Sequence, residues 1–397
     1  MRVLFLSTWF PFPLSQGSKI RAYYLIRAAA RYHDTALISF AEEPIESSWI
    51  DHIHQFCNQV KLVEKNPFAT TRIERVRGWF SKEPSLVRSA YSKDMDALVR
   101  EFADEWKPDR IVAFTFVMGA YALRANRASN IIDVDNFMSQ MMFEAYKEAE
   151  DVGTNVRRYL AWRKFLNYEK WLYDQYDRCL VVTDKDRDSL CTQLGLNPEK
   201  ICVIPNGVDT DYNFPMGEPP DENTLIFNGS LKYQANFDAV AHFLEDIFPA
   251  IRNENPLVRL SITGRNDGVP FERLPNLDQV DFTGYLDDIR PVVRRSWVCI
   301  VPLRMGGGTR LKILEAMALG TPVVSTSKGA EGLDVSSGKN ILIADNPGEF
   351  AIHVTRLLRD PMLRQTLSLN ASQLVKEKYG WEMIGERFSS CLELISI

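Results

Sequence analysis

Short apolar runs alternate with helix-type patterns along the whole chain. Runs of this kind, bounded by turn residues, predict strands, and the segments between them show the spacing of amphipathic helices. Such alternation is typical of an α/β fold in which helices cover parallel sheets. The predicted strands are residues 3–8, 35–40, 59–63, 110–116, 131–134 and 179–182, followed by 224–228, 259–263, 280–282, 299–303, 322–325 and 340–343.

The chain has 397 residues, which is too long for one hydrophobic core. A Pro-Asn-Gly turn within Ile204–Asp209, followed by a polar, proline-rich segment, predicts the domain boundary. We therefore expect two Rossmann-like domains, residues 1–204 and 205–380, and a final helix over residues 381–397.

Two global properties narrow the class of protein. A formal net charge of −5 argues against a nucleic-acid binder driven by overall charge. The longest uncharged apolar run, Ile111–Leu123, is shorter than the roughly 20 residues that a membrane-spanning helix needs. The sequence therefore predicts a soluble protein, at most peripheral to a membrane.

The stretch PLRMGGGTRLKILEAMALGTPVVST, from Pro302 to Thr326, predicts a ligand site. A strand leads into Gly306–Gly308, a helix follows from about Thr309, and a Gly-Thr-Pro turn leads to the next strand. Glycines let a ligand approach the backbone, and the N–H groups at a helix start favour an anion. Arg310 and Lys312 add positive charge, so we expect a phosphate or diphosphate.

Glu315 lies one turn into the same helix, among apolar neighbours. Glutamate is seldom buried without a partner. A carboxylate beside a phosphate site can accept hydrogen bonds from sugar hydroxyls, so a ribose diol is the expected partner. The alternative is a simple ion pair with a nearby cation on an exposed face.

This stretch resembles the C-terminal signature EAMAxGxPVV of glycosyltransferase family 4, which has the GT-B fold. The segments IPNGVD, DFTGYLDDIRP, GAEGL and YGWEMIGERF occur where that family has them. The resemblance implies two facing Rossmann-like domains, an active site between them and a final helix that returns to the N-terminal domain. It also implies a retaining glycosyltransferase with a nucleotide-diphosphate sugar donor and a glycan or lipid-linked acceptor. By association, the expected role is cytoplasmic surface-polysaccharide synthesis.

The resemblance also assigns residues. Glu315 would hold the nucleotide ribose, and no metal or other cofactor is expected. Catalysis would involve Asp135, Arg310 and Lys312, and the acceptor side would include Gly17, Lys19, Arg21 and Asp133. The donor site would comprise Gly229, Ser230, Gly264, Arg265, Gly284, Tyr285, Gly307, Gly308, Thr309, Arg310, Leu311, Lys312 and Glu315.

The sequence departs from the family pattern at two places. The family usually has a second Glu eight residues before the ribose Glu, and that position is Gly307 here. The usual GRLxxxKG cations are missing, because Ser230 and Ala235 stand at their positions. The donor sugar therefore stays open, and we infer that Arg310 and Lys312 supply the diphosphate cations instead.

Other interpretations remain at this stage. A nucleotide-sugar-binding protein without transfer activity would explain the missing residues, and a nicotinamide oxidoreductase would share the Rossmann halves but lacks GxGxxG. Asp133 and Asp135 form a DxD pattern that could hold a metal ion. The basic, aromatic stretches Thr71–Arg88 and Asn155–Trp171 fit either packing in the core or contact with a membrane surface.

Overall fold

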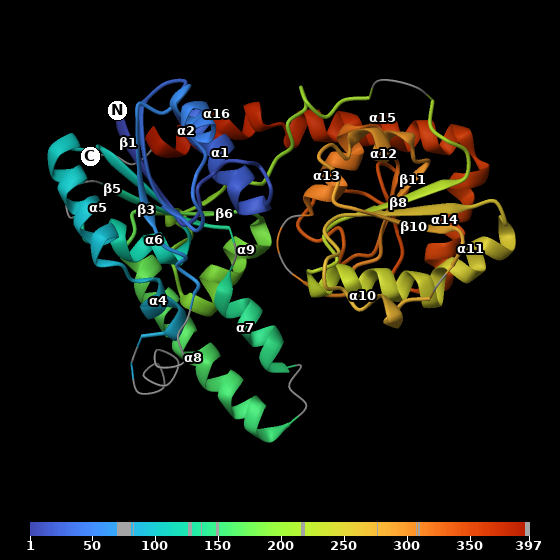
Figure 1. The fold of residues 1–397 in the computed structure, drawn as a ribbon, viewed down its shortest axis with the longest axis horizontal. Helices are drawn as coiled ribbons and strands as arrows, with labels where there is room; N and C mark the ends of the chain where they lie inside the picture. Colours follow the sequence, from blue (N-terminus) through green and yellow to red (C-terminus); the bar gives the residue numbers. More distant parts are fainter. Residues whose placement is uncertain are drawn as a thin grey trace. The chain divides into compact units, whose positions relative to one another are not determined.

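The computed structural model describes residues 1–69, 81, 83–125, 129–135, 137–147, 151–215, 219–275, 277–306, 308 and 310–393. The chain forms two compact units (Figure 1). Unit 1 comprises Met1–Pro205 and the end of the chain from Ile384, and unit 2 comprises Asn206–Met383. Each unit is built on one parallel sheet.

Unit 1 contains a seven-stranded sheet in the order β3-β2-β1-β4-β5-β6-β7. Its strands are β1 Arg2–Ser7, β2 Asp34–Ala41, β3 Gln59–Glu64, β4 Arg110–Phe114, β5 Ser129–Val134, β6 Arg178–Val181 and β7 Ile201–Val203. Its helices are α1 Gly17–Ala29, α2 Ser47–His54, α4 Ser85–Ala90, α5 Lys93–Trp106, α6 Thr115–Ala122, α7 Met138–Lys147, α8 Val152–Asp174 and α9 Asp184–Ser189.

Successive side chains of β1 point to opposite faces of this sheet. Leu4 and Leu6 pack in the core formed with α5, α6 and α8. Phe5 faces the other way, and its ring centroid lies 6.4 Å from that of Phe388 in α16, Trp381–Glu393. The end of the chain thus completes one face of the first sheet.

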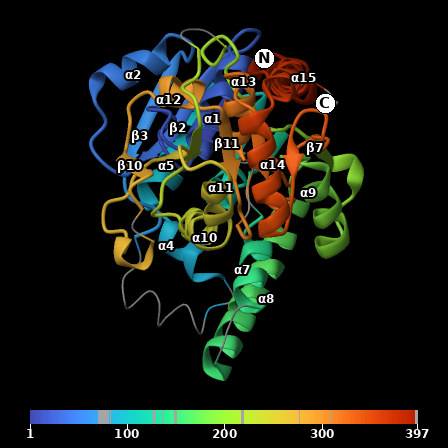
Figure 2. The ribbon, with the colours of Figure 1, turned by 90° about the vertical axis from the view of Figure 1, so that its right-hand side faces the viewer.

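Helices α7 and α8 extend together away from the sheet of unit 1 (Figures 1 and 2). The fully buried Glu169 of α8 joins them, because its carboxylate accepts hydrogen bonds from the backbone N–H groups of Met138 and Ser139, both at 3.2 Å. Tyr173 donates a third bond at 3.1 Å. Burial nevertheless raises the pKa of Glu169 to about 7.

None of the described helices of either unit is both long and apolar enough to cross a membrane.

Unit 2 contains a six-stranded sheet in the order β10-β9-β8-β11-β12-β13. The strands are β8 Thr224–Asn228, β9 Arg259–Thr263, β10 Val280–Gly284, β11 Val298–Val301, β12 Val323–Ser325 and β13 Leu342–Ile343. The helices are α10 Gln234–His242, α11 Phe248–Glu254, α12 Arg290–Arg295, α13 Leu311–Ala318, α14 Pro347–Arg359 and α15 Pro361–Lys378, with α16 beginning at Trp381.

The two Rossmann-like units with parallel sheets that the sequence predicts are confirmed. Several predicted strands differ from the observed ones by one or two residues at their ends, and two differences have a clear structural reason. The strand predicted over residues 110–116 ends at Phe114, and α6 begins at Thr115. Thr115 has φ +73°, a left-handed conformation that interrupts the extended backbone. The short strand β7 was not predicted, because its three residues lie between turn-forming segments.

Candidate functional site

The topological switch point of unit 2 lies between β8 and β11. From β8 the chain continues through β9 to β10 on one side, whereas from β11 it continues through β12 to β13 on the other. Open α/β sheets bind ligands beyond the carboxyl ends of such strands. Gly229 and Ser230 directly follow β8, and the glycine-rich segment follows β11. The predicted donor residues therefore lie at the expected edge of this sheet.

Two glycines bring three strand ends into close contact. Gly229 N–H donates to the Thr263 carbonyl at 2.9 Å, and Gly264 N–H donates to the Gly284 carbonyl at 2.8 Å. Gly264 has φ +122°, and a Cβ there would lie 2.5 Å from the carbonyl carbon and oxygen of Gly229. Only glycine fits this position, and the backbone is left open to a ligand.

The ammonium group of Lys312 lies next to Gly229. Its Nζ donates to Asn236 Oδ1 at 2.9 Å and lies 4.2 Å from the ring centroid of Phe227. A Cβ on Gly229 would lie 2.6 Å from this Nζ. Burial lowers the pKa of Lys312 to about 7, and the charge of Arg310 lowers it further. A bound anion would favour the charged lysine.

Glu315 lies in α13, one turn beyond Lys312. Asn228 Nδ2 donates to Glu315 Oε2 at 3.4 Å, and the amide oxygen of Asn228 faces the thiol of Cys299 at 3.9 Å. Burial raises the pKa of Glu315, whereas the charge of Lys312 lowers it. Among the described residues this carboxylate has one hydrogen-bond donor, so it can still accept bonds from hydroxyl groups.

Arg310 occupies the N-cap position of α13 and is almost completely buried. Its Nη2 donates to the Gly306 carbonyl at 2.7 Å. Gly306 and Gly308 have φ of +94° and +81°, which glycine adopts readily. Leu311 packs against the core of unit 2. The predicted donor residues Gly307 and Thr309 lie outside the described residues.

Arg265 and Tyr285 follow β9 and β10 at the same edge of the sheet. The guanidinium carbon of Arg265 lies 5.5 Å from the ring centroid of Tyr285, and both side chains are exposed. Ser230 Oγ donates to the Arg265 carbonyl at 3.2 Å. This pair offers a planar cation and a ring face, against which a nucleobase could stack.

In unit 1, α1 begins at Gly17, and the next residue contacts Asp135. Ser18 Oγ donates to Asp135 Oδ2 at 2.5 Å. The glycine loop and Asp135 therefore lie together at the carboxyl edge of the first sheet. Lys19 is half-buried, and this burial lowers its pKa while the charges of Glu42 and Glu43 raise it.

Arg21 and Asp133 form a buried ion pair. Both side chains are about 1% exposed, and Arg21 Nη2 lies 2.6 Å from Asp133 Oδ1 while Nε donates to Oδ2 at 2.8 Å. Arg21 Nη1 also donates to the Ile204 carbonyl at 2.8 Å. The arrangement gives both residues a structural role, and it lends no support to the acceptor contact predicted for them. Among the described residues, no group of three or more His, Cys, Asp or Glu residues could hold a metal ion.

Sequence reasoning missed four polar residues at the two switch points. Asn228 and Asn236 position Glu315 and Lys312, as described above. In unit 1, Thr8 follows β1 and Thr115 follows β4, with their hydroxyl oxygens 2.7 Å apart. Asn228 ends β8, and Thr8 and Thr115 directly follow β1 and β4, so the rule that polar residues at the carboxyl ends of switch-point strands face ligands would have found these three. Asn236 lies in α10, and its sequence position gives no such signal.

Comparisons with known proteins identify the families to which the two parts of the chain are similar. Residues 16–212 match the family described as Glycosyltransferase Family 4, and residues 222–360 match Glycosyl transferases group 1. An uncharacterized 44.6 kDa protein in the cps region of Klebsiella pneumoniae is 20% identical over 95% of this chain and 96% of its own length. D-inositol 3-phosphate glycosyltransferase of Streptomyces bingchenggensis is 26% identical, over 54% of this chain and 52% of its own length.

Solved structures share the fold over the whole chain. Sucrose-phosphate synthase of Thermosynechococcus elongatus has a TM-score of 0.74 and 18% identity, covering 99% of this chain and 98% of its own. HepE of Anabaena, in complex with UDP, has a TM-score of 0.68 and 18% identity, covering 99% and 100%. The two Rossmann-like units thus have the GT-B architecture. Because each half of the chain matches a glycosyltransferase family, the protein is a GT-B glycosyltransferase of the family 4 type.

Proposed function

We propose that this enzyme transfers a sugar, with retention of anomeric configuration, from a nucleoside diphosphate sugar to a glycan or glycolipid acceptor in surface-polysaccharide synthesis. The observation that carries the proposal is the juxtaposition of Lys312, Glu315 and the bare backbone of Gly229 at one sheet edge. The positively charged ammonium of Lys312 can pair with a diphosphate, and the carboxylate of Glu315 can accept hydrogen bonds from the two hydroxyls of a ribose. Because Gly229 has no side chain, the diphosphate and the ribose can both approach the backbone there.

In the reaction, the bond between the anomeric carbon and the diphosphate oxygen breaks, and its electrons stay on the diphosphate. The oxygen of the acceptor hydroxyl forms the new bond to the anomeric carbon, and its proton passes to the departing diphosphate oxygen. Lys312 and Arg310 would stabilise the charge that develops on the leaving diphosphate, which is the kind of electrostatic help that often dominates catalysis. Asp135 and the Gly17 loop would face the acceptor. With these cations present, we expect no requirement for a metal ion.

Related proteins guide the choice of donor and acceptor. HepE of Anabaena and the pneumococcal O-GlcNAc transferase GtfA were both solved with UDP, so UDP is the first nucleotide to test. The relative from Klebsiella pneumoniae belongs to a cps region, and WaaG is involved in lipopolysaccharide biosynthesis. These names support, for this chain, a glycan or glycolipid acceptor at the cell surface.

The donor site can be tested without knowing the acceptor. We expect one of UDP, GDP or dTDP to raise the melting temperature of the wild type, equally with and without EDTA, because a ligand that binds the folded state stabilises it. NAD should have no effect. In Glu315→Ala the shift should vanish, because bonds to a charged group contribute about 1.5–3 kcal/mol each, and calorimetry should show affinity lower by at least roughly tenfold.

A matched control is Glu377→Ala, on the exposed surface of α15. It should keep the wild-type response to the same nucleotide. A response to NAD alone, or an unchanged shift in Glu315→Ala, would contradict the proposed donor site. Turnover with a sugar acceptor, followed by NMR of the anomeric proton of the product, separates a retaining transferase from an inverting enzyme and from a protein that only binds.

Donor binding should depend on pH through Lys312. Burial holds its pKa near 7 in the free protein, and a bound diphosphate raises that pKa because it favours the charged form. Binding above pH 7.5 should therefore take up a proton, and affinity should rise as pH falls from 9 and level off below about 7. Calorimetry at pH 8 in two buffers of different ionisation enthalpy measures this uptake. Uptake that persists in Lys312→Met would assign it to another group.

We also infer peripheral contact between the α7–α8 pair and an anionic membrane surface. Val152, Val156 and Leu160 are all more than half exposed and recur every fourth residue, so they share one face of α8. Arg163 lies on the same side of the helix and is exposed. Apolar side chains combined with cations on one face suit the interface of an anionic bilayer. Trp162, by contrast, packs against Phe143 of α7, with ring centroids 4.7 Å apart.

Sedimentation with vesicles tests this contact. The wild type should sediment with phosphatidylglycerol vesicles and stay in solution with phosphatidylcholine vesicles. Leu160→Glu should remain in solution with both, because it places a negative charge at the lipid surface. Leu369→Glu, at a similarly exposed position of α15, is the control and should sediment like the wild type. Equal sedimentation of both variants would exclude α8 as the contact.

A further inference from the structure

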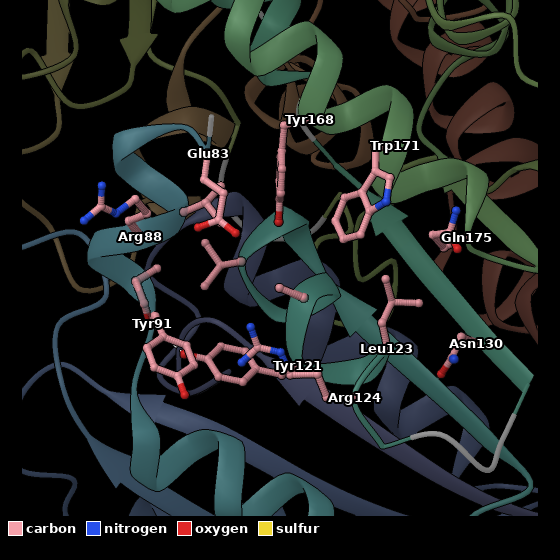
Figure 3. A pocket seen from close by; sticks show the side chains of 14 residues that line it. Glu83, Arg88, Tyr91, Tyr121, Leu123, Arg124, Asn130, Tyr168, Trp171 and Gln175 are labelled. Atoms are coloured by element: carbon pink, nitrogen blue, oxygen red, sulfur yellow. Dashed lines mark hydrogen bonds between the residues drawn. The ribbon is translucent and has the colours of Figure 1, made fainter. Parts of the chain in front are cut away.

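A cavity of about 1000 Å³ opens on unit 1, and none of the residues predicted for the donor or acceptor site lines it (Figure 3). It is bordered by α4, α6 and α8, and Asn130 near the start of β5 lies at its rim. Asp135, which contacts the Gly17 loop, follows the opposite end of the same strand. A strand rises about 3.3 Å per residue, so these two positions are roughly 15 Å apart along the sheet. The cavity is therefore separate from the carboxyl edge.

Aromatic rings form much of its wall. The side chains of Trp171 and Tyr91 are 54% and 42% exposed, which is unusual for large aromatic rings. Each is held by a second ring: Trp171 by Tyr168, with centroids 5.8 Å apart, and Tyr91 by Tyr121, stacked at 6.3 Å. Ring faces carry negative charge and attract the weakly positive C–H groups of a pyranose. The walls thus offer two fixed platforms for sugar rings.

Two buried polar atoms at the cavity lack a hydrogen-bond partner in the described part of the chain. Tyr168 is nine-tenths buried, its hydroxyl points into the cavity, and it makes no hydrogen bond to any described residue (Figure 3). The side-chain oxygen of Asn130 is likewise buried without a partner among the described residues. Buried polar groups are nearly always satisfied, so both atoms suggest a missing ligand. One sugar hydroxyl can accept a hydrogen bond from Tyr168, and another can donate to Asn130.

The charged groups around the rings favour a neutral, hydroxyl-rich ligand. Glu83 and Arg124 both line the cavity. Arg124 is fixed by Asp96 at 3.0 Å and lies 5.0 Å from the ring centroid of Tyr91. Charges of both signs can hydrogen-bond hydroxyl groups, whereas an acyl chain would leave these groups and the two unpartnered atoms unsatisfied.

From these contacts we propose that the cavity is a second carbohydrate site, which binds an oligosaccharide segment by stacking on Trp171 and Tyr91 and by hydrogen bonds to Tyr168 and Asn130. Its role rests on the proposed function: a long acceptor held there stays near the enzyme between transfers, because tethering raises the effective concentration of its free end. Binding itself requires neither donor nor turnover.

The test is binding of neutral oligosaccharides to the full chain without a nucleotide. Maltoheptaose, cellohexaose, chitohexaose and a manno-oligosaccharide at millimolar concentration would be screened by saturation-transfer NMR, and those that bind would be titrated. We expect at least one to bind the wild type. Trp171→Ala should weaken that binding about tenfold. Tyr168→Phe should weaken it about threefold to tenfold without lowering the melting temperature, because the hydroxyl has no partner among the residues that the structure describes.

Tyr32→Ala removes an exposed ring of unit 1 outside the cavity and should bind like the wild type. The proposal is overturned if no oligosaccharide binds, if Trp171→Ala and Tyr168→Phe bind as tightly as the wild type, or if octyl-chain detergent rather than sugar occupies the cavity. Loss of nucleotide binding in the same preparation would count against the donor site alone, so the two failures are distinguishable.

Discussion

Lys312→Met is expected to lower kcat by about 10²–10³-fold, the usual loss when one group that stabilises developing charge is removed. Methionine keeps most of the packing against Phe227 and loses only the ammonium.

The same variant, Lys312→Met, should melt at a temperature no lower than the wild type. The folded chain holds the pKa of Lys312 near 7, below the 10.5 of a free lysine, so between these pH values the unfolded state binds a proton that the folded state lacks. The lysine therefore lowers stability at neutral pH.

The control is Lys232→Met. Lys232 follows β8 in the same part of unit 2, but its exposed ammonium pairs with Asp267 at 2.5 Å. Steady-state kinetics and thermal melts of both variants should show the loss of turnover in Lys312→Met only. If Lys232→Met lost turnover and Lys312→Met kept it, the cation that binds the diphosphate would be Lys232. That residue follows β8, nearer to the position where the family usually has its cations.

Asp133→Ala is expected to destabilise unit 1 by about 3–5 kcal/mol, because it leaves the guanidinium of Arg21 buried without its carboxylate. For a unit of this size, that corresponds to a melting temperature lower by roughly 10 °C. Circular dichroism during heating measures the effect. The double variant Arg21→Met with Asp133→Leu should recover most of the loss, because replacing both charges by apolar groups removes the desolvation cost.

The surface pair of Asp184 with Arg187 provides the control, since Asp184 is largely exposed. Asp184→Ala should change the free energy of unfolding by less than about 1 kcal/mol. If Asp133→Ala instead melted like the wild type but lost activity toward acceptors, Asp133 would belong to the acceptor site predicted from the sequence.

The sequence predicted the strands that carry the candidate donor site. Strands 224–228 and 259–263 have the predicted bounds, because polar residues and turns mark both ends of these short apolar runs. The carboxyl ends of parallel strands meet at one edge, so a glycine after β8 and a glycine-rich loop after β11 had to lie close together. Asp135 and the Gly17 loop meet at the edge of unit 1 for the same reason.

Side-chain partners could not be predicted in this way. Nothing in the sequence links Arg21 of α1 with Asp133 of β5, and only the structure reveals that they neutralise each other. Residues 110–116 form one apolar run because both the strand and the helix that follows it are buried. The run therefore hides the turn at Thr115. Asn228 and Asn236 carry no motif beyond their place at the end of a strand and in the first turn of a helix.

The last helix has a consequence for how the protein is made. Phe5 in the first strand contacts Phe388, and a Cβ on Gly385 would lie 2.6 Å from the Cβ of Ala28. The ribosome therefore supplies one face of the first unit only after the whole second unit has been synthesised, roughly ten to thirty-five seconds later at usual elongation rates. During that interval the apolar surface that α16 covers beside Phe5 and Ala28 stays exposed, and a chaperone has a defined surface to protect.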